Sequence, residues 1–372
     1  MTHRRAIVAV VLACLIGCVM AQACKVPVFR YALERWPADK YRIVAVSDGP
    51  VAAAITAAIN DLKQSPANAT VETIDLSQLS EAELWQIEGI EQHAETPMLQ
   101  VFYPERNGQR KLCWQGNLSV ANVVAWQSST LRQQLAADLQ SGVSAVWVIV
   151  EGNNQQANDE FATKLHRALE VSTESITIPE GVITRSKASE YFDSHPGASM
   201  DDVLRSDIPL RIDFKIIRLK QTDDEIALRA MMSSFVKTTS PPFAIPVFGR
   251  GRMIEPLSAD ALTTVTVLSA CNYLVGQCSC TMKALNPGVD LLLSTDWQEN
   301  LGNEIVLVDT ISNEPTKALT IPPGRTETES PRADQLAAEK PESYSQPHYI
   351  VAGAFVLIGF ASLLLWTCRR KG

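Results

Sequence analysis

The chain alternates short apolar runs with amphipathic segments from residue 41 onward. Residues 41–47, YRIVAVS, form an apolar run typical of a buried strand. Residues 51–64 follow with apolar side chains at helical spacing, and residues 71–76 alternate with a period of two. These three segments predict a βαβ unit, in which a helix connects two parallel strands by a right-handed crossover.

The pattern then changes to a hairpin followed by helices. Thr96-Pro97 opens an apolar run, a turn follows, and residues 111–116 supply a second strand, which together predict an antiparallel hairpin. Ser119 is suited to cap a helix after this hairpin, and a second helical stretch ends at Ser141-Gly142. These elements predict a first α/β domain over residues 24–142, in the order βαβ and then ββα.

A similar pattern recurs in the next part of the chain. Strand, helix, strand, helix and hairpin are predicted in turn at residues 144–152, 159–170, 209–219, 223–235 and 244–258. This recurrence predicts a second, degenerate copy of the first domain over residues 143–320. The alternative is a single larger α/β domain.

The order of elements resembles that of the thioredoxin superfamily. That family places a cis-proline at the start of its third strand, the position that Thr96-Pro97 takes here. The family's redox motif, Cys-x-x-Cys, opens the first crossover helix, whereas this chain has Ser47-Asp48-Gly49-Pro50 there and no thiol. The resemblance implies an α/β fold of tandem thioredoxin-like domains, and the missing motif argues against the family's usual oxidoreductase chemistry.

The C-terminal part of the sequence has the features of a membrane-spanning segment. Residues 349–367 are uncharged and mostly apolar, and about 20 such residues in a helix cross a hydrocarbon layer of about 30 Å. The basic residues in 368–372 predict a short cytoplasmic tail. Residues 321–348 are rich in Pro, Glu and Ser, which predicts a disordered linker before one C-terminal transmembrane helix.

The N-terminal part agrees with this topology. Residues 1–23 have a basic start, an apolar stretch and the small-residue site Ala21-Gln22-Ala23, as in a secretory signal peptide. Leu15 to Cys18 also resembles the lipobox of bacterial lipoproteins. Cleavage before Cys24, lipidation of Cys18 or Cys24, and an uncleaved anchor all stay open. All three leave the main region outside the cytoplasm, and the predicted topology is a single-pass type I protein of the cell membrane.

Composition narrows the function classes. The chain has 372 residues, 46% of them hydrophobic, and a formal charge of −8, which suits folded domains. Nucleic acid is excluded as a partner because phosphate neutralisation needs clustered Lys and Arg, and no basic stripe is present. The expected partners are the lipid bilayer and a protein in a membrane-associated complex. No motif for a cofactor is present, and none is expected.

Cysteines are the first candidates for chemistry. Five of the eight lie in the predicted exported region: Cys24, Cys113, Cys271, Cys278 and Cys280. An exported compartment permits disulfides, and the odd number leaves one thiol free, lipidated or paired between chains. A disulfide from Cys271 to Cys278 or Cys280 is expected, because a bond between Cys278 and Cys280 would close a strained ring. A reactive thiol pair and a soft-metal site are the alternatives, although structural zinc usually takes four ligands.

Two further motifs have competing interpretations. Cys24 precedes a helix-like segment. Its thiol is interpreted in three alternative ways: as a disulfide partner, as a lipid anchor or as a nucleophile. The run Gly249 to Arg252 would offer backbone amides and the guanidinium groups of Arg250 and Arg252 to an anion. The alternative is a hairpin turn, in which the glycines adopt positive φ angles.

Several longer segments resemble a known protein group. Residues 24–36, 144–152, 245–252 and 278–297 resemble exported, membrane-attached proteins of planctomycete-type bacteria. This resemblance implies a compartment and an architecture but no activity. Two function classes are therefore open. The first is a non-catalytic binding or assembly region, which the absence of catalytic motifs favours. The second is an atypical thiol oxidoreductase or metal-handling protein that uses Cys271, Cys278 and Cys280.

Overall fold

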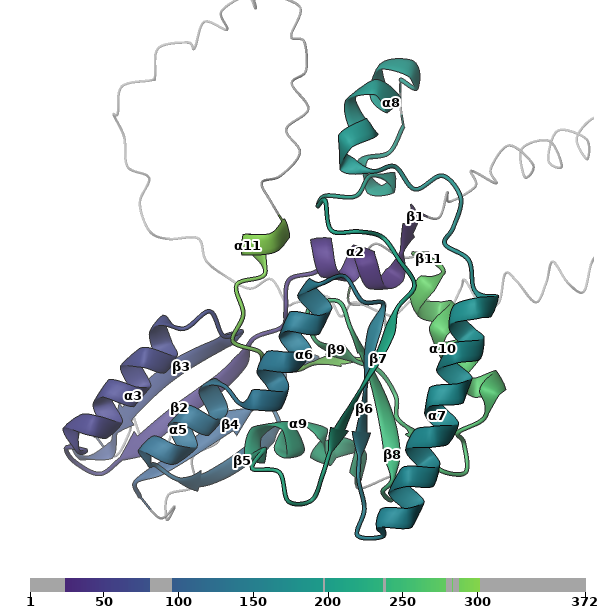
Figure 1. The fold of residues 1–372 in the computed structure, drawn as a ribbon. Helices are drawn as coiled ribbons and strands as arrows, with labels where there is room; N and C mark the ends of the chain where they lie inside the picture. Colours follow the sequence, from purple (N-terminus) through teal and green to yellow (C-terminus); the bar gives the residue numbers. More distant parts are fainter. Residues whose placement is uncertain are drawn as a thin grey trace, which may run out of the picture. The chain divides into compact units, whose positions relative to one another are not determined.

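A computed structural model shows a mixed α/β fold with two main sheets (Figure 1). It describes residues 24–80, 96–196, 198–236, 239–278, 283 and 288–301. All of these belong to one compact unit. The predicted signal peptide, linker, transmembrane helix and cytoplasmic tail lie outside the described residues. None of the described helices has the length and apolar character needed to cross a bilayer.

The first sheet has four strands in the order β3-β2-β4-β5. Their bounds are β2 Tyr41–Ser47, β3 Ala69–Asp75, β4 Met98–Phe102 and β5 Leu112–Asn117. Strand β2 runs parallel to β3 and antiparallel to β4, and β5 is antiparallel to β4. The predicted βαβ unit and hairpin are therefore confirmed. The Thr96-Pro97 peptide bond directly before β4 is cis, as the resemblance implies.

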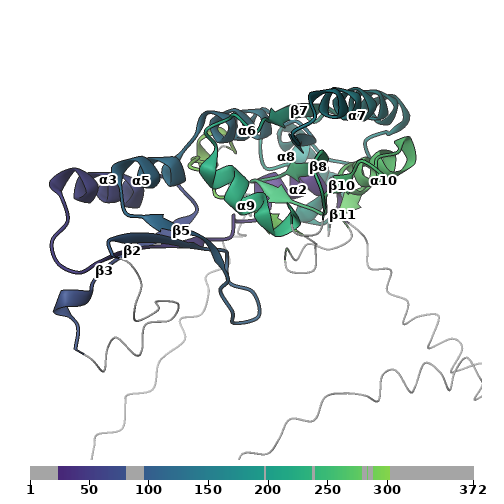
Figure 2. The same ribbon diagram turned by 90° about the horizontal axis from the view of Figure 1, so that it is seen from below.

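Two helices cover one face of this sheet. Helices α3 (Ala53–Gln64) and α5 (Val120–Gln127) lie side by side above the strands in Figure 2. The Ser119 side chain accepts a hydrogen bond from the Asn122 amide at 3.2 Å, which confirms the predicted N-cap. The short 3-10 turn η1 (Leu76–Gln78) follows β3.

The second sheet repeats the strand order and directions of the first. Its strands are β6 Ala145–Val150, β7 Phe214–Leu219, β8 Phe243–Phe248, β9 Arg252–Met253, β10 Leu257–Ser258 and β12 Val289–Asp290. The order is β12-β9-β8-β6-β7, with β10 paired to β8. Strand β6 is parallel to β7 and antiparallel to β8, and β9 is antiparallel to β8. The Pro241-Pro242 bond before β8 is also cis.

Helices pack on both faces of the second sheet, which explains why β6 is apolar throughout. The main helices are α6 Thr130–Gln140, α7 Gln155–Ser175, α9 Ile226–Val236 and α10 Thr264–Val275. Val146 and Val148 join the core shared with the first sheet, α6 and α9. Trp147 and Ile149 join a second core with α7 and α10. Successive strand residues point to opposite faces, so one strand supplies both cores.

Two elements of the first predicted domain contact the second sheet. Helix α2 (Val28–Arg35) packs against β8 and α10, and α6 packs against β6 and β7. The contacts of the described residues therefore cross the predicted boundary at residue 142. Within the predicted strand at 209–219, only residues 214–219 form strand β7.

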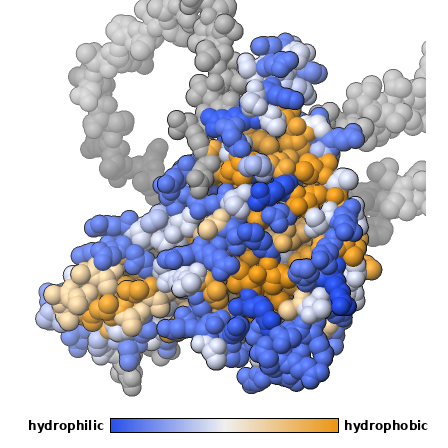
Figure 3. Space-filling view, viewed as in Figure 1, coloured by the Kyte–Doolittle hydropathy of each residue, from blue (hydrophilic) through white to orange (hydrophobic). Residues whose placement is uncertain are grey.

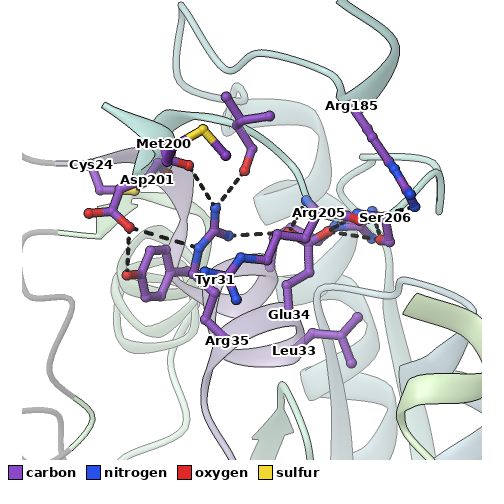
Figure 4. A network of polar contacts seen from close by, with 12 residues as sticks. Cys24, Tyr31, Leu33, Glu34, Arg35, Arg185, Met200, Asp201, Arg205 and Ser206 are labelled. Carbon is purple, nitrogen blue, oxygen red and sulfur yellow. Dashed lines mark hydrogen bonds and ion pairs between the residues drawn. The ribbon is translucent and has the colours of Figure 1, made fainter. Parts of the chain in front are cut away.

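A short ladder joins the start of the described chain to a distant segment. Strand β1 (Cys24–Pro27) is antiparallel to β11 (Gln277–Cys278). The remaining short elements are η2 Arg185–Lys187, α8 Ala188–Ser194, η3 Met200–Asp202 and α11 Gln298–Leu301. The segment that carries α8 and η3 connects α7 to β7, and it packs on α2 through polar contacts (Figure 4).

Candidate functional site

The turn after β2 is the position at which the predicted thioredoxin resemblance would place redox thiols. Gly49 has a φ of 101°, and its amide donates a hydrogen bond of 2.8 Å to the Asp75 carboxylate at the end of β3. The Ser77 hydroxyl donates to the same carboxylate oxygen at 2.7 Å. The Ser77 hydroxyl and the Gly49 amide hold the pKa of Asp75 below its usual range. This turn is closed by local hydrogen bonds and contains no sulfur.

The corresponding turn after β6 is also polar and closed. The Gly152 amide donates to the Asn158 side chain at 2.9 Å, and the Asn158 amide group donates back to the Gly152 carbonyl at 3.0 Å. Arg218 on β7 forms ion pairs with the buried Glu151 and with Asp159. A side chain at Gly152 would lie 3.2 Å from the Pro241 carbonyl oxygen, so glycine allows the two loops to approach closely. This arrangement again offers no nucleophile.

Two cysteine thiols lie away from both turns. Cys271 on α10 is fully buried against α7, and burial raises its pKa to about 12 despite a hydrogen bond with Ser172. Cys113 on β5 is half-buried, and burial raises its pKa to about 12, although a hydrogen bond with Tyr103 opposes the shift. A thiol in this state is a poor nucleophile because the thiolate is the reactive form.

We expect both thiols to resist alkylation in the folded protein. With each pKa near 12, the thiolate fraction at pH 8 is roughly a thousandfold below that of an ordinary thiol. Iodoacetamide at pH 8 should therefore modify Cys113 and Cys271 at least a hundredfold more slowly than in urea-unfolded protein. The rate should rise about tenfold per pH unit while the fold persists. Timed quenching and peptide mass spectrometry measure this, and rapid labelling of either thiol in folded protein would contradict it.

The remaining predicted thiols are those of Cys24, Cys278 and Cys280. The β1–β11 register sets Cys24 opposite Cys278, and Cys280 lies outside the described residues. The expected bond from Cys271 to Cys278 or Cys280 stays a prediction. Among the described residues, no group of three or more His, Cys, Asp and Glu side chains is arranged to hold a metal ion.

The two arginines of the predicted anion motif bind other parts of the protein. Arg250 donates to the Leu33 carbonyl at 2.8 Å and to the Glu34 carbonyl at 3.3 Å, both in the last turn of α2. Arg252 is buried and donates to Asp290 at 3.0 Å. Gly249 and Gly251 have φ angles of 59° and 97°, as the turn interpretation requires. The geometry therefore favours the turn over the anion site.

A groove lies over β7, between α6 and α7. It has a volume of about 550 Å³, and its lining residues are Gln134, Asp138, His166, Leu169, Glu170, Thr173, Glu174, Phe214, Lys215 and Ile216. Its floor is apolar because Leu169, Phe214 and Ile216 pack on the second core. Figure 3 shows apolar side chains on this face between polar helices.

The walls of the groove are mainly acidic. Lys215 is paired with Asp138 at 2.7 Å, and His166 lies 3.5 Å from Glu170. Glu174 adds a further exposed carboxylate. The local balance is three carboxylates to one lysine, so the groove favours a cationic ligand over an anionic one.

Strand β7 presents an open edge in this groove. It pairs with β6 on one side, and no other described strand pairs with its second side. The carbonyls of Asp213 and Leu219 accept hydrogen bonds from the Ser144 and Glu151 amides at 2.7 and 3.0 Å. Because backbone groups of successive strand residues point to opposite sides, those of Phe214, Ile216 and Arg218 face the open edge. The edge can therefore accept another strand.

The sequence predicted strand β7, which forms part of this groove, but it did not predict that one edge of the strand is open. The alternation in residues 209–219 indicated β structure, yet it cannot tell an edge strand from a central one. The acidic residues of α7 carried no signal of their own, because they look like the solvent face of an amphipathic helix.

No family model matches the chain, and no curated protein matches it.

Proposed function

We propose that this chain is a single-pass membrane protein whose extracytoplasmic region is a non-catalytic binding module of two thioredoxin-like halves. The tandem assignment is supported by the shared strand order of the two sheets, β3-β2-β4-β5 and β7-β6-β8-β9. It is also supported by the shared directions, because in each of these four-strand orders the first pair is parallel and the next two pairs are antiparallel.

The non-catalytic assignment is supported by the two polar turns. Both turns that follow the first parallel strand lack a thiol and are closed by hydrogen bonds, through Asp75 in one half and Asn158 in the other. The burial of Cys271 weakens the competing proposal of a thiol or metal centre that includes it. Thiolate chemistry needs an accessible sulfur with a lowered pKa.

The observation that carries the binding assignment is the open edge of β7. An unpaired edge with an apolar floor suits an extended peptide that adds a strand through its main chain. The acidic walls at Glu170 and Glu174 suit basic side chains on such a peptide. We therefore propose that the groove binds an extended segment of a partner protein in which apolar and basic residues alternate.

Synthetic peptides test this binding. A capped ten-residue peptide of alternating valine and lysine should bind the folded extracytoplasmic region more tightly than the matching valine–glutamate peptide. In the variant Glu170→Lys/Glu174→Lys, affinity for the lysine peptide should fall roughly tenfold or more, because two attractive charges become repulsive. Isothermal titration calorimetry gives the affinities, and slowed amide exchange at residues 214–218 would locate the peptide.

A control variant separates the effect of charge in the groove on peptide affinity from the effect of the net charge of the protein. Glu160→Lys/Glu190→Lys makes the same change in net charge at exposed positions outside the groove. It should leave affinity for the lysine peptide within about twofold, because neither position lines the groove and solvent screens the interactions of exposed charges. Equal weakening by both double variants, or no binding at all, would contradict the proposal.

The membrane attachment rests on the sequence alone. Residues 349–367 and the basic tail 368–372 support one span with the folded region outside the cytoplasm. Protease added to inner-membrane vesicles of known sidedness tests this topology. Digestion of the large region from the cytoplasmic side would contradict it.

A further inference from the structure

The β1–β11 ladder brings together two cysteines that are far apart in the chain. In this antiparallel ladder Cys24 is the partner of Cys278 and Pro27 is the partner of Gln277, with a shift of register between the two pairs. The Val28 amide also donates to the Gly276 carbonyl at 3.1 Å, which extends the contact by one residue pair. Directly opposed residues of an antiparallel pair have Cα atoms about 4.5 to 5.5 Å apart.

That spacing is suited to a covalent bond. Disulfides join residues whose Cα atoms are about 4.4 to 6.8 Å apart. We propose that Cys24 and Cys278 form a disulfide across β1 and β11. The two thiols lose two protons and two electrons to a disulfide oxidant, whose own S–S bond is reduced to two thiols as the new S–S bond forms. The proposal rests on the export proposed above, because an oxidising compartment supplies such an oxidant.

The surroundings of Cys24 hold it in place for this bond. Cys24 is 6% exposed, and its thiol donates a hydrogen bond of 2.8 Å to the Asp201 carbonyl, a bond that it gives up when the thiol proton leaves on disulfide formation. The Lys25 amide donates to the Asp202 carboxylate at 2.8 Å, and Val26 is fully buried. Figure 4 shows Cys24 beside Asp201 and Tyr31. This packing fixes the strand, and a bulky lipid on Cys24 would have to displace it.

The other described thiols are poorly placed to compete for Cys278. Cys271 is fully buried between α10 and α7, where its thiol forms a hydrogen bond with Ser172. Cys113 belongs to β5 in the first sheet. Each of these thiols is therefore expected to stay reduced when Cys24 and Cys278 are joined.

Mass spectrometry of the full chain is the direct test. The protein is exported to a bacterial periplasm, alkylated without reduction, and digested with trypsin and chymotrypsin. Cleavage after Tyr273 or Leu274 separates Cys271 from Cys278. A peptide that links Cys24 to Cys278 is expected in the wild type and in the Cys271→Ser and Cys280→Ser variants, and it should disappear in Cys278→Ser. A bond from Cys271 to Cys278, a bond from Cys24 to Cys280, a lipid on Cys24, or full alkylation of Cys24 and Cys278 would each overturn the proposal.

Thermal unfolding provides a second readout. Dithiothreitol should lower the Tm of the wild type by roughly 5 to 10 °C, because the bond closes a long loop in the unfolded chain. It should leave the Tm of Cys24→Ser unchanged, and an equal shift in that variant would count against the bond. Binding of the lysine peptide to the β7 groove should be the same in Cys24→Ser as in the wild type. Failure of the disulfide and failure of the proposed binding function are therefore separate outcomes.

Discussion

Replacing Glu34 by alanine is expected to lower the free energy of unfolding by about 3 to 5 kcal/mol. The Glu34 side chain is fully buried on α2, and its carboxylate lies 2.8 Å from Arg30 Nε. It also accepts hydrogen bonds from the Arg205 amide at 2.8 Å and the Ser206 hydroxyl at 2.8 Å (Figure 4). Without Glu34, the fully buried Arg30 guanidinium loses its ion-pair partner, and the segment before β7 loses its acceptor on α2.

The measurement is urea-induced unfolding followed by tryptophan fluorescence. Glu72→Ala is the matched control, because Glu72 also pairs with an arginine, Arg42 at 2.8 Å, but is 45% exposed. Exposed pairs contribute about 0 to 1 kcal/mol, so this variant should change little. If Glu34→Ala is no more costly than Glu72→Ala, the buried network does not hold α2 as described.

Replacing Arg132 by leucine is expected to cost at least about 3 kcal/mol of folding free energy. Arg132 is buried on α6 and donates to the carbonyls of Trp126 at 3.2 Å and Leu292 at 3.1 Å, and also to that of Ala125. Ala125 and Trp126 lie in the last turn of α5, whose carbonyls lack partners within the helix. One side chain therefore joins α5, α6 and the segment after β12.

The charge of Arg132 persists despite its burial. Burial lowers its pKa to about 10, against the attraction of Glu225, so the group is protonated at neutral pH. Leucine would fill part of the space but leave three buried carbonyls without a donor. Chemical unfolding at pH 7 measures the loss.

Two further variants test the cause of this loss. Arg132→Lys should recover less than half of the stability, because a lysine ammonium cannot reproduce the planar fork of donors. Arg167→Leu, at an exposed position of α7, should change the free energy of unfolding by no more than about 0.5 kcal/mol. A cost for Arg132→Leu as small as that for Arg167→Leu would show that the carbonyls find other donors.

Much of the secondary structure was predictable from local patterns. Strand β2 coincides with the predicted run 41–47, β6 (Ala145–Val150) lies within the predicted run 144–152, and Ser119 caps α5 as expected. These features depend on side-chain periods of 2 and 3.6 residues and on cap chemistry, which are readable within one segment.

The candidate sites were less predictable. Arg30 and Glu34 are four residues apart on a helix, a spacing that sequence alone assigns to a solvent-exposed pair. The two-residue strands β9, β11 and β12 are too short to show a period. The predicted thiol cluster relied on closeness in sequence, whereas the β-ladder sets Cys278 opposite the distant Cys24.

The sequence by itself determined the alternation of strands and helices, the absence of thiols from the turn after β2, and the acidic net charge of the chain. Only the tertiary structure decided that β7 is an edge strand, that Arg30, Glu34 and Arg132 are buried, and that Cys24 faces Cys278. The physical reason is that burial and strand pairing depend on contacts between segments distant in the chain. Such contacts leave no period or motif in either segment alone.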